Sequence, residues 1–288
     1  MTARVALIGA GLMGAGLARL FAAQGWPVTI WDRDADAAAR LASGSVRVAR
    51  DLADAVQDAD LVIEAIAEIA EAKQALFAEL AGLTGEGTIL ATNSSVIPVG
   101  TVAARIDDAQ AGRVVGTHFW NPPDLIPLVE VIRGPRTVPA TVERTMSLLI
   151  QAGREPVRVD GDVVPGNRLQ HALWREAMAL VDEGLCTPED VDRIVKRSFG
   201  ARLAVLGPLE NADLVGLELT EQIHRVVLPM LSRATEPSPG LRDRIGAGAA
   251  GIAAGKGFHT GWNAQNVAIL RDRLSTHLRA SFAPGTAT

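Results

Sequence analysis

The sequence contains no tyrosine and a single cysteine among its 288 residues. Without tyrosine, the chain cannot be a dehydrogenase that uses a tyrosine–lysine couple as acid and base. The single cysteine, Cys186, excludes a disulfide framework and a zinc site built on several thiolates. We therefore expect Cys186 to be a buried thiol, and we expect no metal site.

An excess of positive charge and long apolar runs are also missing. The net charge is −5, and no basic stripe with interleaved aromatic residues is present, so nucleic acid is not an expected partner. No run approaches the ~18 apolar residues that a membrane span needs. Five glycines in the first 26 residues indicate a strand, a turn and a helix rather than a signal peptide. We therefore expect a cytoplasmic protein without a membrane partner.

The pattern along the chain indicates two domains. Residues 1–160 alternate short apolar runs with helical segments, which predicts an α/β domain with a doubly wound, parallel, Rossmann-type sheet. Strands are expected within residues 4–10, 27–32, 59–66 and 87–93, and helices within residues 12–25 and 68–83. From residue 161 to residue 288 the pattern is helical, which predicts an all-helical C-terminal domain.

The expected helices of the second domain cover residues 167–184, 187–200, about 212–233 and about 263–280. The second of these has a clear start signal. Thr187 is the expected N-cap, Pro188 occupies the first turn, and Asp190 is placed to complete a capping box. The last six residues, 283–288, are expected to be frayed.

A glycine motif follows the first expected strand. The sequence GAGLMG places Gly9, Gly11 and Gly14, with Leu12 and Met13 between them, in the spacing G-x-G-x-x-G. The motif opens a helix, and Asp32 closes the next strand, a context that predicts a dinucleotide site. Its phosphates would lie at the helix N-terminus. The alternative is a glycine-rich turn without a ligand.

Asp32 and Arg33 bear on the choice between NAD and NADP. Asp32 is expected to accept hydrogen bonds from the adenosine ribose and to repel a 2′-phosphate. Arg33 follows directly and would favour that phosphate. On balance the sequence favours NAD.

One histidine of the five stands out by its position. His118 lies at the end of an apolar run in GTHFWNPPDLIPLVEVI, where the carboxyl edge of an α/β sheet is expected. The double proline forces a turn, so the chain can return antiparallel and bring Glu130, a single carboxylate in an apolar run, beside His118. A carboxylate on one ring nitrogen is the arrangement that a histidine base needs. From these residues alone, a structural pair is as good an interpretation as a catalytic one.

Several motifs together resemble the 3-hydroxyacyl-CoA dehydrogenase family. They are GAGLMG, EAIAE with Lys73 after it, TNSS, HFWNPP…PLVEVI and NRLQHALWREA…VDEG…TPEDVD, and they span nearly the whole chain. The resemblance implies an N-terminal NAD-binding domain, a helical C-terminal domain that forms a homodimer, and an active site between them. It also implies a small-molecule substrate.

The resemblance assigns roles to individual residues. His118 matches the catalytic base and Glu130 its orienting carboxylate. Ser95 and Asn167 match the polar groups that hold the reacting oxygen. The residues that match positions near the ribose and nicotinamide of NAD are Glu68, Lys73 and Asn93. In the implied reaction, His118 removes the proton of a 3-hydroxyl group while C3 transfers its hydride to the nicotinamide.

The chain departs from the acyl-CoA enzymes in ways that concern the substrate. Those enzymes carry a long basic helical insertion after the second strand, which grips CoA, and this chain has only a short segment there. Its Arg40, Arg47 and Arg50 could meet a phosphate, although a solvated surface is the default interpretation. The sequences NPPDLIPLVE and RLAVLGPLE look closer to the branch that acts on free hydroxy acids, such as L-gulonate 3-dehydrogenase and L-carnitine dehydrogenase. In that branch Arg202 would pair with a free carboxylate, although an arginine packed at a domain seam is as good an interpretation.

Two further departures affect the C-terminal part. The segment before Asn167 is compressed to VPGNR, and Ala253 replaces a lysine that the resemblance leads us to expect, with Lys256 three places on. These changes put the position of Asn167 and the shape of the substrate pocket in question.

The sequence therefore predicts an NAD-dependent oxidoreductase that interconverts a 3-hydroxy acid or 3-hydroxyacyl thioester and its 3-oxo form. A small free acid or a short acyl group is favoured as substrate. One alternative is a 3-hydroxyacyl-CoA dehydrogenase proper. Another, of a different class, is a non-catalytic dinucleotide-binding protein of crystallin type. The β-hydroxyacid dehydrogenases rank lower, because none of the three lysines lies in their helical lysine motif.

Overall fold

A computed structural model describes residues 2–282 and divides the chain into two compact units, Met1–Pro165 and Gly166–Thr288. Each unit is described by itself. Segment 283–288, where fraying was expected, lies outside the described residues. Within the described residues no helix is both long and apolar enough to cross a membrane.

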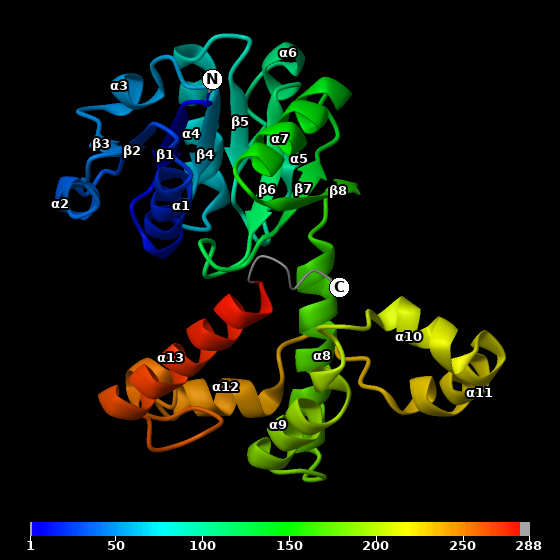
Figure 1. The fold of residues 1–288 in the computed structure, drawn as a ribbon. Coiled ribbons are helices and arrows are strands. Elements are labelled where there is room, and N and C mark those ends of the chain that lie inside the picture. Colours follow the sequence, from blue (N-terminus) through cyan, green and yellow to red (C-terminus); the bar gives the residue numbers. More distant parts are fainter. Residues whose placement is uncertain (1, 283–288) are drawn as a thin grey trace. The chain divides into compact units, whose positions relative to one another are not determined.

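The first unit is built on one eight-stranded sheet with the order β3-β2-β1-β4-β5-β6-β7-β8 (Figure 1). The strands are β1 (Val5–Ile8), β2 (Val28–Trp31), β3 (Val46–Val48), β4 (Leu61–Glu64), β5 (Ile89–Thr92), β6 (Val114–Phe119), β7 (Leu128–Arg133) and β8 (Glu155–Asp160). All neighbours are parallel except β6 and β7, which are antiparallel. The predicted doubly wound sheet is therefore confirmed, and so is the antiparallel return after the double proline.

Helices cover both faces of this sheet. They are α1 (Leu12–Ala23), α2 (Ala35–Ala39), α3 (Leu52–Val56), α4 (Ala70–Leu83), α5 (Val99–Val102), α6 (Asp108–Ala111) and α7 (Pro139–Gln151). On one face, Phe21 of α1 and Leu149 of α7 belong to one apolar core. On the other, Phe77 of α4 and Val102 of α5 belong to a second core. Strands buried on both sides explain why the sequence reads as continuous apolar runs.

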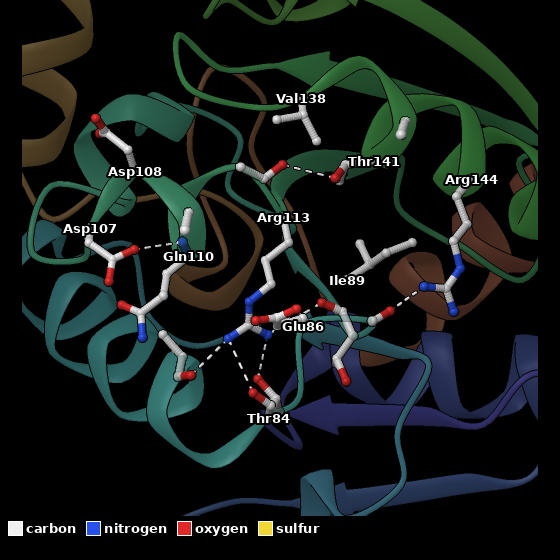
Figure 2. Close-up of a pocket in the computed structure, with 16 residues that line it drawn as sticks. Thr84, Glu86, Ile89, Asp107, Asp108, Gln110, Arg113, Val138, Thr141 and Arg144 are labelled. Atoms are coloured by element: carbon white, nitrogen blue, oxygen red, sulfur yellow. Dashed lines mark hydrogen bonds between the residues drawn. The ribbon is translucent and has the colours of Figure 1, made fainter.

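Arg113, just before β6, holds the end of α4. Its guanidinium donates to the carbonyl of Ala81 at 2.7 Å and to the hydroxyl of Thr84 at 2.6 Å (Figure 2). Burial lowers the pKa of Arg113. These bonds satisfy groups that a helix C-terminus leaves without partners.

A hollow of about 680 Å³ lies beside Arg113 and is also lined by Glu86, Asp107 and Arg144 (Figure 2). It lies where β5 and β6 begin, since Ile89 and Arg113 both line it. In open α/β sheets ligands bind at the opposite edge, outside the carboxyl ends of the strands. The chemistry of this unit is therefore sought at that other edge.

The second unit is helical, as predicted. It contains α8 (Pro165–Asp182, which begins at the unit boundary), α9 (Pro188–Arg197), η1 (Phe199–Ala201), α10 (Pro208–Val215), α11 (Leu217–Val227), η2 (Leu228–Met230), α12 (Pro239–Gly246), η3 (Ile252–Ala254) and α13 (Ala264–Ser281). The prediction of one helix over about 212–233 is wrong. Gly216 has a φ of +97°, which no right-handed helix accommodates, and it separates α10 from α11.

Local details around α9 agree with the sequence in part. Thr187 caps the helix by accepting from the amide of Asp190, with Pro188 in the first turn, as predicted. The Asp190 carboxylate accepts from the Thr187 hydroxyl at 2.8 Å, where a capping box would have it accept from the backbone amide. Cys186 is half-buried, so the expectation of a buried thiol is not met.

Candidate active site

The glycine motif forms the turn between β1 and α1. Gly9 has a φ of +113°, and a Cβ there would lie 2.6 Å from the carbonyl oxygen of Ala65. A Cβ on Gly14 would lie 1.9 Å from the carbonyl oxygen of Gly9. A Cβ on Gly11, in contrast, would meet no atom within 4 Å. Gly9 and Gly14 are therefore required by packing, whereas Gly11 faces open space at the N-terminus of α1.

This geometry fits the phosphates of a dinucleotide. Gly11 is the N-cap residue of α1, and no side chain among the described residues caps that end. The first amides of a helix have no intrahelical partner and favour an anion. Of the two residues between the glycines, Leu12 is exposed and Met13 packs on the core.

Asp32 lies directly after β2 and faces the glycine turn. Its Oδ2 accepts from the amide of Ala10 at 2.6 Å, and its Oδ1 accepts from the amide of Asp34 at 2.8 Å. The carboxylate therefore fixes the turn that would hold the phosphates. Arg33 is exposed. The contact of Asp32 with a ribose stays a prediction.

His118 and Glu130 are paired across β6 and β7. The two residues are opposite each other in the antiparallel register, and Nδ1 of His118 lies 2.7 Å from Oε2 of Glu130. Both are 4% exposed. An ionised carboxylate only accepts hydrogen bonds, so Nδ1 carries the proton in this pair. The predicted juxtaposition is therefore confirmed.

Ser95 lies at the other ring nitrogen of His118. Its hydroxyl lies 3.2 Å from Nε2 of His118. With the proton on Nδ1, neutral Nε2 is an acceptor, so the Ser95 hydroxyl donates to it. A histidine whose tautomer is fixed on one side and whose other nitrogen meets a hydroxyl has the geometry of a general base.

The turn after His118 is packed against α1. A Cβ on Gly16 of α1 would lie 2.5 Å from Cγ of Pro123, so the two segments approach as closely as a glycine allows. Arg19 and Asp124 form a salt bridge at 3.4 Å between the same segments. The glycine-rich helix and the turn that follows His118 are therefore in direct contact.

Three residues predicted near the cofactor lie at the same sheet edge. Lys73 is 1% exposed, and its Nζ is 3.3 Å from Oε2 of Glu68. Glu68 accepts from the amide of Ser95 at 2.7 Å and from the hydroxyl of Ser94 at 2.9 Å. Asn93 accepts from the amide of Phe119 at 3.0 Å. Lys73, Glu68, Ser95 and His118 are thus linked in that order by an ion pair and two hydrogen bonds. Asn93 holds the backbone directly after His118.

Sequence reasoning did not single out Glu64, the last residue of β4. Glu64 is completely buried, and it accepts from Lys73 Nζ at 2.5 Å and from the Thr92 hydroxyl at 2.7 Å. The available signal was a lone carboxylate in an apolar run, the same signal that marks Glu130. Replacing both members of a buried ion pair by apolar residues is often neutral for stability, while removing one costs about 3–5 kcal/mol. Stability alone therefore does not explain the pair.

Two predicted site residues belong to the second unit. Asn167 is half-buried in the first turn of α8, and Arg202 is exposed after η1. Their participation in the site stays a prediction.

Comparison with known proteins places these features in a family. The sequence profile "3-hydroxyacyl-CoA dehydrogenase, NAD binding domain" matches residues 4–46 and 40–163, and the profile "3-hydroxyacyl-CoA dehydrogenase, C-terminal domain" matches residues 165–261. Together the two profiles account for most of both units.

Individual relatives match over most of their length. The chain is 34% identical to 5-formyl-3-hydroxy-2-methylpyridine 4-carboxylate 5-dehydrogenase of Mesorhizobium japonicum, over 95% of each protein. It is 36% identical to L-carnitine dehydrogenase of Streptomyces griseus, over 88% of this chain and 84% of the relative. A crystal structure of the 5-formyl-3-hydroxy-2-methylpyridine 4-carboxylic acid 5-dehydrogenase, described as an NAD⁺-dependent dismutase, superposes with a TM-score of 0.91 at 32% identity, over 98% of this chain and 99% of that one.

Proposed function

The chain belongs to the 3-hydroxyacyl-CoA dehydrogenase family, and from that premise we propose that its own substrate is a small free 3-hydroxy acid or a short acyl group. As a member of the family it is an NAD-dependent oxidoreductase that interconverts a 3-hydroxy compound and its 3-oxo form. Two relatives named after small carboxylate substrates support the choice of a free acid.

The observation that carries the choice is the short segment after Asp32. Between β2 and β4 the chain has only α2, β3 and α3, and each of the two helices has five residues. No long helical insertion is present there to surround a CoA moiety. The NAD-binding profile also matches in two pieces that meet at residues 40–46, within this segment.

Two arginines of this segment, Arg47 and Arg50, are held by Asp54. Arg47 donates to the Asp54 carboxylate and to the Asp54 carbonyl, both at 2.9 Å. The amide of Arg50 donates to the same carboxylate at 2.9 Å, and its guanidinium lies 3.5 Å from it. A side chain whose charge is already paired is a weak attraction for the phosphates of CoA.

The catalytic roles follow from the geometry around His118. Nε2 removes the proton of the substrate hydroxyl as the C3 hydrogen leaves with its electron pair, so the C3–O bond becomes a carbonyl and the imidazole becomes cationic. Glu130, at Nδ1, stabilises that cation. The Ser95 hydroxyl, and Asn167 from the second unit, hold the reacting oxygen. The glycine turn and Asp32 would hold NAD, which would supply the acceptor for the hydride.

Arg202 is the residue that we assign to the substrate carboxylate. A guanidinium binds a carboxylate through two parallel hydrogen bonds, which a thioester cannot accept in the same way. Glu68, Lys73 and Asn93 are assigned to the nicotinamide side of the cofactor site.

The assembly is a homodimer in the cytoplasm. Apolar side chains of the second unit support the dimer, since Leu209, Leu214 and Met230 are each at least 75% exposed. Large apolar side chains with this much exposed area are expected where a protein associates with a partner. A non-catalytic role of crystallin type does not require the Ser95–His118–Glu130 arrangement, and we do not favour it.

The test is NADH consumption by the purified protein with free 3-oxo acids and, in parallel, with acetoacetyl-CoA. Turnover of free acids that falls in Arg202→Gln supports the proposal. Turnover confined to the thioester overturns the assignment of a free acid and of Arg202 to its carboxylate, in favour of a 3-hydroxyacyl-CoA dehydrogenase proper. His118→Ala is the control for contaminating dehydrogenases, because that variant contains no catalytic base.

A further inference from the structure

Glu64 is a buried carboxylate whose oxygens are turned toward protein donors. Oε1 accepts from Lys73 Nζ at 2.5 Å and from the amide of Ile66 at 2.8 Å, and Oε2 accepts from the Thr92 hydroxyl at 2.7 Å. Its side chain has no exposed area. Glu64 therefore acts on neighbouring protein groups and does not reach a ligand directly.

The ammonium group of Lys73 lies between the carboxylates of Glu64 and Glu68. Its ammonium is 2.5 Å from Glu64 and 3.3 Å from Glu68, and among the described residues these are its ion-pair partners. The closer contact goes to Glu64, which is buried, whereas Glu68 is 39% exposed. In a buried setting an ammonium without a carboxylate is costly, so Lys73 stays with whichever partner is present.

The pairing with Glu64 leaves Glu68 able to hold the TNSS segment. Oε1 of Glu68 accepts from the amide of Ser95, and Oε2 accepts from the hydroxyl of Ser94. If Glu64 loses its charge, Lys73 draws Glu68 toward itself, and the bonds to Ser94 and Ser95 lengthen. The charge of Glu64 thus determines where Glu68 lies.

The position of Ser95 matters because its hydroxyl meets Nε2 of His118 at 3.2 Å. The links Glu64–Lys73–Glu68–Ser95–His118 run along the carboxyl ends of β4, β5 and β6. We infer that Glu64 is a positioning residue: through Lys73 and Glu68 it fixes Ser95 against the histidine base. The inference rests on the proposed role of His118.

The test compares Glu64→Gln with Thr92→Val in the full-length protein. Glu64→Gln removes the charge and keeps the size, and we expect kcat to fall about ten- to a hundredfold, the scale of a displaced catalytic group. Thr92→Val leaves the charge of Glu64 unchanged but removes two bonds of the Thr92 hydroxyl, the one to that carboxylate and the one accepted from the amide of Ser94 at 3.2 Å. Because Glu68 still holds Ser94 and Ser95, we expect kcat to stay within about threefold of the wild type. Equal losses in the two variants would overturn the inference, because a merely structural role does not distinguish them.

A double-variant cycle with Ser95→Ala identifies the route of the effect. Because Glu64 acts through Ser95, we expect Glu64→Gln to lower kcat by less than about threefold in the Ser95→Ala background. A loss as large as in the wild-type background would overturn the inference. If Glu64→Gln does not fold, Glu64→Asp enters the same cycle: it keeps the charge but moves the carboxylate away from Lys73, so we expect a smaller loss of kcat than for loss of the charge, again absent in the Ser95→Ala background, and an equal loss in both backgrounds would overturn the inference.

A substrate-independent measurement separates this inference from the proposed function. In ¹⁵N spectra of the histidine side chains, we expect Glu64→Gln and Ser95→Ala to shift the Nε2 signal of His118, and Thr92→Val to leave it in place. An unshifted signal in Glu64→Gln overturns the inference, even if the wild type were to turn over neither free acids nor thioesters. The proposed function, in contrast, fails through the substrate assay alone.

Discussion

Nδ1 of His118 lies 2.7 Å from Oε2 of Glu130, from one antiparallel strand to the next, with both residues 4% exposed. The two are direct partners in the strand register, so the backbone hydrogen bonds of β6 and β7 hold the pair in place. Because the carboxylate fixes the proton on Nδ1, the opposite nitrogen is the one available to accept a proton.

His118→Ala tests the base directly. We expect kcat to fall about 10²- to 10⁴-fold, the usual contribution of a positioned acid–base group, with NAD binding unchanged because the glycine turn is untouched. Glu130→Gln should cost less, since the imidazole remains but its tautomer is no longer fixed. Steady-state kinetics and titration of NAD by fluorescence measure the two effects. Undiminished turnover in His118→Ala would contradict the mechanism.

The pH dependence of the rate gives a second test. The neutral imidazole removes the alcohol proton, so oxidation should be faster at higher pH. Reduction of the 3-oxo compound needs the protonated ring, so it should be slower at higher pH. Initial rates of oxidation and of reduction, each measured against pH at saturating cofactor, check the two opposite trends. Parallel slopes in the two directions would exclude a histidine that serves both.

Much of this site could be predicted because its signals are local in the sequence. The glycine spacing with Asp32 predicted the tight turn between β1 and α1, and the double proline with one carboxylate in the following strand predicted the partner of His118. Glu64 carries the same signal as Glu130, but its main partner, Lys73, comes from a helix nine residues on rather than from a hairpin. A pattern within one strand does not reveal that pairing.

Contacts between distant segments could not be predicted from the sequence either, because they depend on how the strands pair. Glu68 bonds to the amide of Ser95, 27 residues away, at an edge that forms only when β4 and β5 pair. The break at Gly216 was missed because one glycine inside a long helical pattern costs only about 1 kcal/mol and does not by itself end a helix.

Gly11 and Gly14 should respond differently to the same change. Gly11→Ala places a methyl group in open space, so the protein should unfold at the wild-type temperature. If the pyrophosphate approaches there, the methyl should weaken NAD binding at least about tenfold, ~1.4 kcal/mol. Gly14→Ala forces its Cβ onto the carbonyl oxygen of Gly9, so it should destabilise the fold by about 1–3 kcal/mol or more. Thermal unfolding and calorimetric NAD titration of both variants make the comparison, and unchanged NAD affinity in Gly11→Ala would argue against a phosphate at this turn.

Asp32→Ser tests the preference for NAD. The variant removes the charge that repels a 2′-phosphate, and Arg33 beside it can then attract that phosphate. We expect the ratio of kcat/KM for NAD to kcat/KM for NADP to fall about tenfold or more, ~1.4 kcal/mol. Since Asp32 also fixes the amide of Ala10, activity with NAD itself should decrease. Arg33→Ala in the same background is the matched control, because it should abolish the gain with NADP.

Asp54, in the short segment after Asp32, should make the stability of the protein depend on pH. Hydrogen bonds from the Arg50 amide and the Arg47 guanidinium hold the pKa of Asp54 below its usual value of 3.8. A lowered pKa means that the carboxylate stabilises the fold above pH 3.8 and that this contribution is lost as pH falls through the lowered value. Asp54→Asn should therefore melt below the wild type at neutral pH, and the difference in Tm should shrink toward zero in acid. Melting curves of both proteins from about pH 7 to about pH 2 measure this. The same variant tests whether the paired arginines explain a weak affinity for CoA. Asp54→Asn frees Arg47 from its ion pair, so it should increase the affinity for acetoacetyl-CoA if that pairing keeps Arg47 from the CoA phosphates. An unchanged affinity would mean that the short segment excludes CoA by its length alone.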